Sequence, residues 1–204
     1  MNSDNYTTFI KGLATAEMPL YVSIFHAVRN IPYGVTGERS PDAVLKNHLG
    51  SCSGKHILLR DLLITAGFTA EVVTIYCHFN KGLPQHSSFP PDLAEMIRKG
   101  EMVDYHHYVR AQIDGDWLHL DATWPDALQI YGFPVNIDWK GVGHTHIAAT
   151  AIEEYAAVDN LAEFKQGLIA ALPRDVREAR SRFFAKLTQW MQQELPPSNV
   201  EKTM

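Results

Sequence analysis

Two strand-like segments meet at a turn signal near the middle of the chain. Residues 106–113 and 117–122 carry strand patterns, and Asp114-Gly115 lies between them. An Asp-Gly pair in this setting predicts a β-hairpin with a type I′ turn, because both central residues of that turn need a positive φ. A two-residue turn also determines the register of the two strands by counting outward from it.

This register predicts that one side of the hairpin is apolar and faces the core. Side chains alternate along a strand, so the odd positions of the first strand share a side with the even positions of the second. The residues on this side are Val109, Ala111, Ile113, Leu118, Leu120 and Ala122.

The opposite side of the hairpin brings a histidine close to a carboxylate. It carries His106 and Asp121 as diagonal neighbours, whereas the adjacent His107 belongs to the apolar side. His106 is therefore the better candidate for a general base, with Asp121 holding its tautomer. The alternative is an ordinary cross-strand polar pair facing solvent, and a bulge or three-residue loop would shift the register.

A cysteine stands at the start of a strongly apolar helical pattern. Residues 51–66 predict a central helix with Ser51 as its N-cap and Cys52 in its first turn. The free N–H groups and the dipole at a helix N-terminus favour an anion, so they lower a thiol pKa from its usual value of about 8.5. The alternative for Cys52 is a small buried hydrophobe, and position alone does not decide between the two roles; we assign the buried role to Cys77, inside a strand expected at 71–79.

The remainder of the chain predicts one domain over residues 1–204. We expect a core at about 20–147, and a helical extension at about 148–195 that Pro173 divides. Further helices are expected at 17–30, 41–49 and 93–99.

The charge and the N-terminal sequence limit the partners and the compartment that we expect. The net charge of −5 and the lack of a basic patch give no reason to expect a nucleic-acid partner. The chain shows no signal-peptide pattern and no apolar stretch of about 20 residues, so we expect a cytoplasmic protein without a membrane partner. The oligomeric state stays open.

Three of these segments, in this order, resemble the transglutaminase-like core. That pattern is a Gly-x-Cys helix start, a His-Ala-Trp-Val strand and, fifteen residues after the His, an Asp followed by Pro-Thr. The chain has Gly50-Ser51-Cys52, His106-His107-Tyr108-Val109 and Asp121-Ala122-Thr123. The resemblance, over about residues 45–125, implies an α+β, papain-like fold in which the Cys-bearing helix packs on an antiparallel sheet, with extra N- and C-terminal helices. It implies Cys52 as nucleophile, His106 as base and Asp121 as the orienting carboxylate.

Departures from the family pattern leave the substrate open. Tyr108 stands where the family usually has Trp, Arg110 where an acidic residue is frequent, and Ala122 where Pro is usual. The family includes cross-linking enzymes, peptidases, amidases and inactive members. We expect acyl transfer through a thioester on a peptide, protein or small amide, without a cofactor, with Tyr108, Trp117 and Trp124 as substrate-binding residues.

Two other classes of function compete with this one. His144 and His146 place two imidazoles near each other, and with His119 or His86 they suggest metal-dependent hydrolysis, although no HExxH or paired-Cys motif supports it. A silent peptide- or protein-binding module on the same fold is the second alternative.

Overall fold

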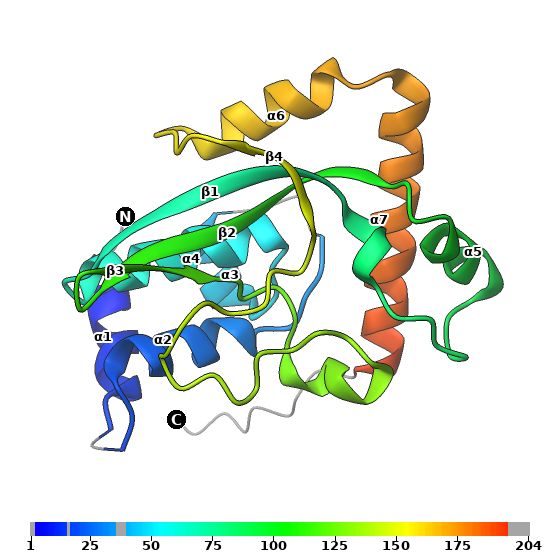
Figure 1. The fold of residues 1–204 in the computed structure, drawn as a ribbon. Helices are drawn as coiled ribbons and strands as arrows, with labels where there is room; N and C mark the ends of the chain where they lie inside the picture. Colours follow the sequence, from blue (N-terminus) through cyan, green and yellow to red (C-terminus); the bar gives the residue numbers. More distant parts are fainter. Residues whose placement is uncertain (1–2, 16, 36–39, 196–204) are drawn as a thin grey trace.

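The computed structural model describes residues 3–15, 17–35 and 40–195, which form helices around a four-stranded sheet (Figure 1). The elements in chain order are α1 (Ser3–Leu13), α2 (Leu20–Arg29), α3 (Pro41–Asn47), α4 (Cys52–Thr65), β1 (Thr69–His78), η1 (Phe79–Gly82), α5 (Pro91–Lys99), β2 (Val103–Ile113), β3 (Asp116–Leu120), η2 (Asp126–Tyr131), β4 (Ala151–Tyr155), α6 (Leu161–Ala171) and α7 (Arg174–Glu194).

The sheet has the order β3-β2-β1-β4, and each neighbouring pair is antiparallel. The predicted hairpin register is confirmed, since Ile113 pairs with Asp116 and Val109 with Leu120. Asp114 and Gly115 both have positive φ, at 52° and 95°, as a type I′ turn requires. The predicted apolar side of the hairpin also lies in the core, against α4.

The central helix α4 packs against β1 and β2. Its buried leucines are Leu58, Leu59, Leu62 and Leu63. Gly67 ends it with a φ of 94°, and the Phe68 N–H donates to the Leu63 carbonyl oxygen at 3.0 Å. The structure thus confirms an α+β fold in which a Cys-bearing helix packs on an antiparallel sheet, with further helices at both ends of the chain.

The expected helical extension at 148–195 was wrong in its first part. Residues 151–155 form β4, which pairs with β1 at the sheet edge and has a register shift between Tyr76 and Cys77. The pairing partner is far away in the sequence, so the exposed segment Ala-Ile-Glu-Glu-Tyr gives no strong local strand pattern. The helix α1 was also not predicted.

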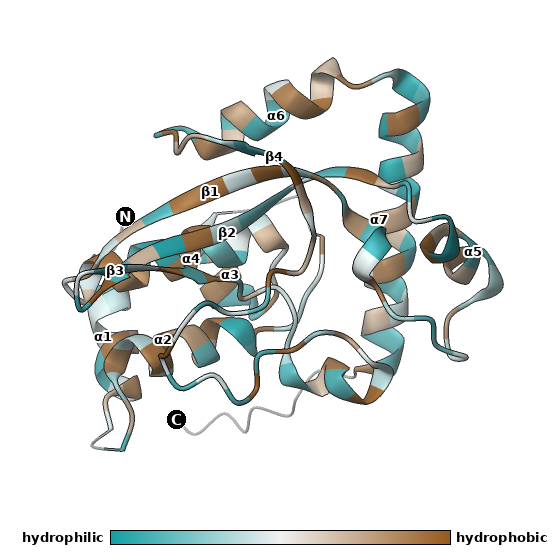
Figure 2. Ribbon diagram, viewed as in Figure 1, coloured by the Kyte–Doolittle hydropathy of each residue, from teal (hydrophilic) through white to brown (hydrophobic). Residues whose placement is uncertain are grey.

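The two C-terminal helices differ in how firmly they are packed. Helix α7 buries Phe183, Phe184, Leu187, Trp190 and Met191. In contrast, α6 buries only Leu161 and Lys165. Figure 2 shows hydrophobic bands along α7 between hydrophilic ones, as expected for a helix that buries one face.

Over the described part of the chain, no helix combines the length and the apolarity needed to cross a membrane.

Candidate active site

Cys52 is the first residue of α4 and is 3% exposed. Ser51 occupies the N-cap position in an extended conformation, but its hydroxyl makes no capping hydrogen bond. The N–H groups of the first turn are therefore not occupied by the usual side-chain acceptor. This leaves them available to an anion beside the sulfur atom.

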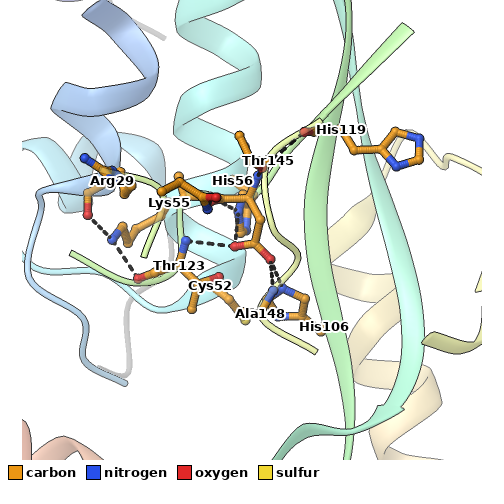
Figure 3. Close-up of polar contacts among 12 residues, drawn as sticks. Arg29, Cys52, Lys55, His56, His106, His119, Thr123, Thr145 and Ala148 are labelled. Carbon is orange, nitrogen blue, oxygen red and sulfur yellow. Dashed lines mark hydrogen bonds and ion pairs between the residues drawn. The ribbon is translucent and has the colours of Figure 1, made fainter. Parts of the chain in front are cut away.

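His106 and Asp121 form a buried hydrogen-bonded pair. Figure 3 labels His106, Cys52 and the neighbouring Thr123, Thr145 and Ala148. The His106 Nε2–H donates to Asp121 Oδ2 at 2.7 Å. The other ring nitrogen, Nδ1, is buried and has no hydrogen-bond partner among the described residues, while the ring interacts electrostatically with the Cys52 thiol. Nδ1 is thus the nitrogen that is left to exchange a proton with Cys52.

Backbone N–H groups from two further segments hold the Asp121 carboxylate in place. Oδ2 also accepts from the Ala148 N–H at 2.8 Å, and Oδ1 accepts from the Thr123 N–H at 2.9 Å. The Asp121 N–H itself donates to Thr145 Oγ1 at 2.8 Å. Although burial raises the pKa of this carboxyl, the His106 imidazole and its hydrogen bond hold the pKa well below the usual range.

A second imidazole lies beside Asp121 but is neutral. His56 Nε2 is 3.4 Å from Asp121 Oδ1, yet it accepts a hydrogen bond from the Ala122 N–H at 2.8 Å. A ring nitrogen that accepts carries no proton, and burial also lowers the pKa of His56. His56 therefore positions the segment that follows β3 and carries Asp121. It leaves His106 as the partner of the carboxylate.

The electrostatics of the site favour an ionised cysteine and a charged histidine. Burial alone raises the pKa of Cys52, but the Lys165 ammonium and the His106 imidazole lower it to about 7. Burial lowers the pKa of His106, whereas the Asp121 carboxylate and its hydrogen bond raise it to about 10. Between these values the two groups form a thiolate–imidazolium pair.

A buried lysine fixes the start of α4, and sequence reasoning missed it. The Lys55 Nζ donates to the carbonyl oxygens of Arg29 and Ile31, both at 2.8 Å, and of Thr123 at 3.0 Å. Burial lowers its pKa, but three acceptors need three N–H donors, so the side chain is an ammonium. It connects the end of α2 and the segment after Asp121 to the helix of Cys52.

A second lysine, also missed, approaches the cysteine from α6. The Lys165 Nζ lies 3.9 Å from Cys52 Sγ and donates to Ser53 Oγ at 3.1 Å. The cavity at Cys52 measures only about 10 Å³. A groove of about 670 Å³ between α1, α2 and α3 is lined by none of Cys52, His106 and Asp121, so volume alone does not mark the candidate site.

The residues predicted to bind substrate take different places, and none of them lines the cavity at Cys52. Tyr108 is buried, and its hydroxyl donates to Glu154 Oε2 at 2.7 Å. Trp124 is also buried and packs on Tyr33. Trp117 is 42% exposed near the hairpin turn, at the opposite end of the strand pair from His106, and its role in substrate binding stays a prediction.

The histidines of the metal alternative make other contacts. His119 stacks on His144, with ring centroids 4.3 Å apart, and the His119 N–H donates to His144 Nδ1. Within the described ranges, no three His, Cys, Asp or Glu side chains converge as metal ligands would. Cys77 is buried in β1, and burial raises the pKa of its thiol, as suits a structural cysteine.

Comparison with known proteins gives partial likenesses only. No family model and no curated protein matches the chain. The crystal structure of a proposed cysteine protease from Cytophaga hutchinsonii matches 62% of this chain at 18% identity and a TM-score of 0.42. A proposed protease from Parabacteroides distasonis matches 62% at 22% identity and a TM-score of 0.40. The chain spans 39% and 24% of these proteins.

Proposed function

We propose that this chain is a cysteine-dependent acyl-transfer enzyme of the peptidase, amidase or transglutaminase type. The observation that carries the proposal is the His106–Asp121 hydrogen bond of 2.7 Å beside a cysteine whose pKa is lowered to about 7. A nucleophile, a base and a group that orients the base are the three parts that covalent acyl chemistry needs.

In the first half-reaction, Cys52 Sγ attacks the carbonyl carbon of a carboxamide or peptide bond. The negative charge moves to the carbonyl oxygen, where the Cys52 backbone N–H stabilises it at the uncapped helix start. The carbon–nitrogen bond then breaks, and His106 gives its Nδ1 proton to the departing amine. The product is a thioester on Cys52.

In the second half-reaction, water or an amine attacks the thioester. His106 Nδ1 takes the proton of the attacking group, and the carbon–sulfur bond breaks to return the thiolate. Asp121 keeps its charge throughout and stabilises the imidazolium each time it forms. Because Cys52 must stay a free thiol, we expect the chain to act in a reducing compartment such as the cytoplasm.

The closed cavity favours a second candidate function. A space of about 10 Å³ holds about one water molecule, which is far too small for a peptide group. A silent peptide- or protein-binding module on the same fold fits this observation, because binding at the outer surface does not need this cavity to open. The two functions differ in whether a covalent acyl-enzyme forms.

Acid-quenched mass spectrometry of the intact protein, incubated with peptide carboxamides, tests the proposed function. We expect an acyl adduct on Cys52 in the wild type, none in Cys52→Ala, and formation slowed by about 10²–10⁴-fold in His106→Ala. His107→Ala is the matched control, since that residue is equally buried and adjacent. If Cys52→Ala turns over a substrate at the wild-type rate, the proposal fails; an active-site thiol that never forms an adduct favours the binding module.

A further inference from the structure

Lys165 is a charged side chain at a place where a surface helix would normally offer an apolar one. It is 3% exposed, and Leu161 is the only other buried residue of α6. Its Nζ reaches both Cys52 Sγ, at 3.9 Å, and Ser53 Oγ, at 3.1 Å. One of the two buried side chains of α6 therefore contacts the nucleophile of the proposed function.

The charged groups nearest to Lys165 favour an ionised Cys52. Arg180 of α7 pairs with the buried Asp104 of β2, with its Nε donating to Asp104 Oδ1 at 2.7 Å. Although burial raises the pKa of Asp104, Lys165 and Arg180 hold it below its usual range. Lys165, Arg180 and Asp104 together carry one excess positive charge, and this excess attracts a thiolate on Cys52.

The same contacts close the site. Residues from α6 and α7 complete the wall of the cavity of about 10 Å³ at the sulfur. Its lining is Tyr33, Val35, Ser51, Cys52, Ser53, Asp104, Lys165, Arg180 and Phe184. Helix α7 is held by five buried apolar or aromatic side chains, so α6 is the element that is able to move at low cost.

We propose that Lys165 is the counter-ion of the Cys52 thiolate, and that this ion pair is a catch which holds α6 closed over the active site. The inference rests on the proposed function, in which this thiolate is the nucleophile. An acylated or alkylated Cys52 is neutral, so its formation removes the partner of Lys165 and weakens the catch. By linkage, opening α6 must in turn raise the pKa of Cys52.

The ionisation of Cys52 depends on charges from every element around it. Lys165 of α6 and His106 and Asp104 of β2 act on it directly, and the other titratable groups that face this region are Arg180 of α7, Lys55 of α4 and the Cys77 thiol of β1. The Lys165 charge is the largest single cause that lowers the pKa of Cys52, and the hydrogen bond and the charge of His106 follow as two separate causes. Removing the Lys165 charge therefore tests the catch without touching the His106–Asp121 pair.

The experiment is the rate of Cys52 alkylation by iodoacetamide between pH 5 and 10, resolved by site with mass spectrometry. In Lys165→Met, we expect the midpoint of the profile to rise by at least about one pH unit. A more basic thiolate is intrinsically only about threefold more nucleophilic per unit of pKa. We therefore expect a rise of the high-pH plateau well beyond threefold, because the open site admits the reagent.

Two controls sharpen this outcome. Lys165→Arg keeps the charge, so we expect its midpoint to stay near that of the wild type. Lys99→Met removes an exposed lysine at the end of α5 and should change neither quantity. A Lys165→Met midpoint equal to that of the wild type overturns the proposal, and so does a plateau that rises no more than the change in nucleophilicity requires.

Hydrogen exchange gives an independent test should Lys165→Met fold poorly. In Cys52→Ala, the amides of residues 161–171 should exchange at least about tenfold faster than in the wild type, while those of α5 stay unchanged as an internal reference. Equal protection of α6 in both proteins overturns the catch. Neither experiment uses a substrate, so a protein without turnover still reports on the catch, and an active enzyme without a catch refutes only this inference.

Discussion

Asp121 connects the stability of the protein to pH, because three N–H groups donate to its carboxylate. They come from the His106 side chain and from the backbone of Thr123 and Ala148. Its folded-state pKa lies well below the value of about 3.9 for an unfolded chain. The stabilisation is therefore complete above about pH 4 and is lost as the pH falls towards the folded-state pKa.

Asp121→Asn removes this charge and should lower the free energy of unfolding at pH 7 by about 1.5–3 kcal/mol. We also expect the variant to lose less stability than the wild type between pH 5 and pH 2, since it lacks one carboxylate of depressed pKa. Urea unfolding at several pH values measures both effects. Parallel acid profiles for the two proteins would contradict this account of Asp121.

Lys55→Met leaves three buried carbonyl oxygens without their donor. The variant should unfold with a free energy about 3–5 kcal/mol lower than the wild type, because each buried acceptor loses a hydrogen bond and water does not reach it. Relief from burying an ammonium offsets part of the loss. Lys99→Met, on the exposed end of α5, should change stability by less than about 0.5 kcal/mol. Similar urea midpoints for both variants would show that Lys55 is not a structural anchor.

Among the elements, the β2–β3 hairpin is the one whose turn geometry is most demanding. Gly115 has a φ of 95°, and a Cβ added there would meet no atom within 4 Å. Gly115→Ala should therefore lower the free energy of unfolding by about 1–2 kcal/mol through backbone strain alone. Asp114→Asn, a residue type that tolerates positive φ, should be nearly neutral. Thermal unfolding compares the two, and an equal loss in both variants would speak against a strained turn.

The hairpin also shows which contacts can be predicted from the sequence alone. Its register depends on a two-residue turn and on alternation, which are local rules, so the contact between His106 and Asp121 was predictable. Helix α4 and its Gly67 terminus were predictable for the same reason. The strand β4 was not, because its pairing partner lies far away in the sequence.

The missed residues of the site have one property in common. Both are lysines, a residue type that usually faces solvent and is rarely buried, yet Lys55 and Lys165 are both buried. The most distant contact of Lys55 is with Thr123, 68 positions away, and that of Lys165 is with Cys52, 113 positions away. No periodicity or motif encodes such contacts, so only the folded chain reveals them.

At the scale of the whole molecule, the unequal packing of α6 and α7 predicts unequal protection. Native-state hydrogen exchange should show α6 opening with a free energy at least about 2 kcal/mol below that of α7, whose amides exchange only through larger unfolding events. The measurement uses the wild-type protein under native conditions. Opening of both helices with one free energy would mean that they form a single cooperative unit.

The 113-residue separation between Cys52 and Lys165 has a consequence for synthesis. The chain emerges from the ribosome N-terminus first, so Cys52, His106 and Asp121 are all available once residue 121 has left the exit tunnel. Lys165 follows 44 residues later (165 − 121 = 44), or roughly two to nine seconds at typical elongation rates. During each round of translation, the Cys52 thiol therefore spends seconds without its contact to Lys165.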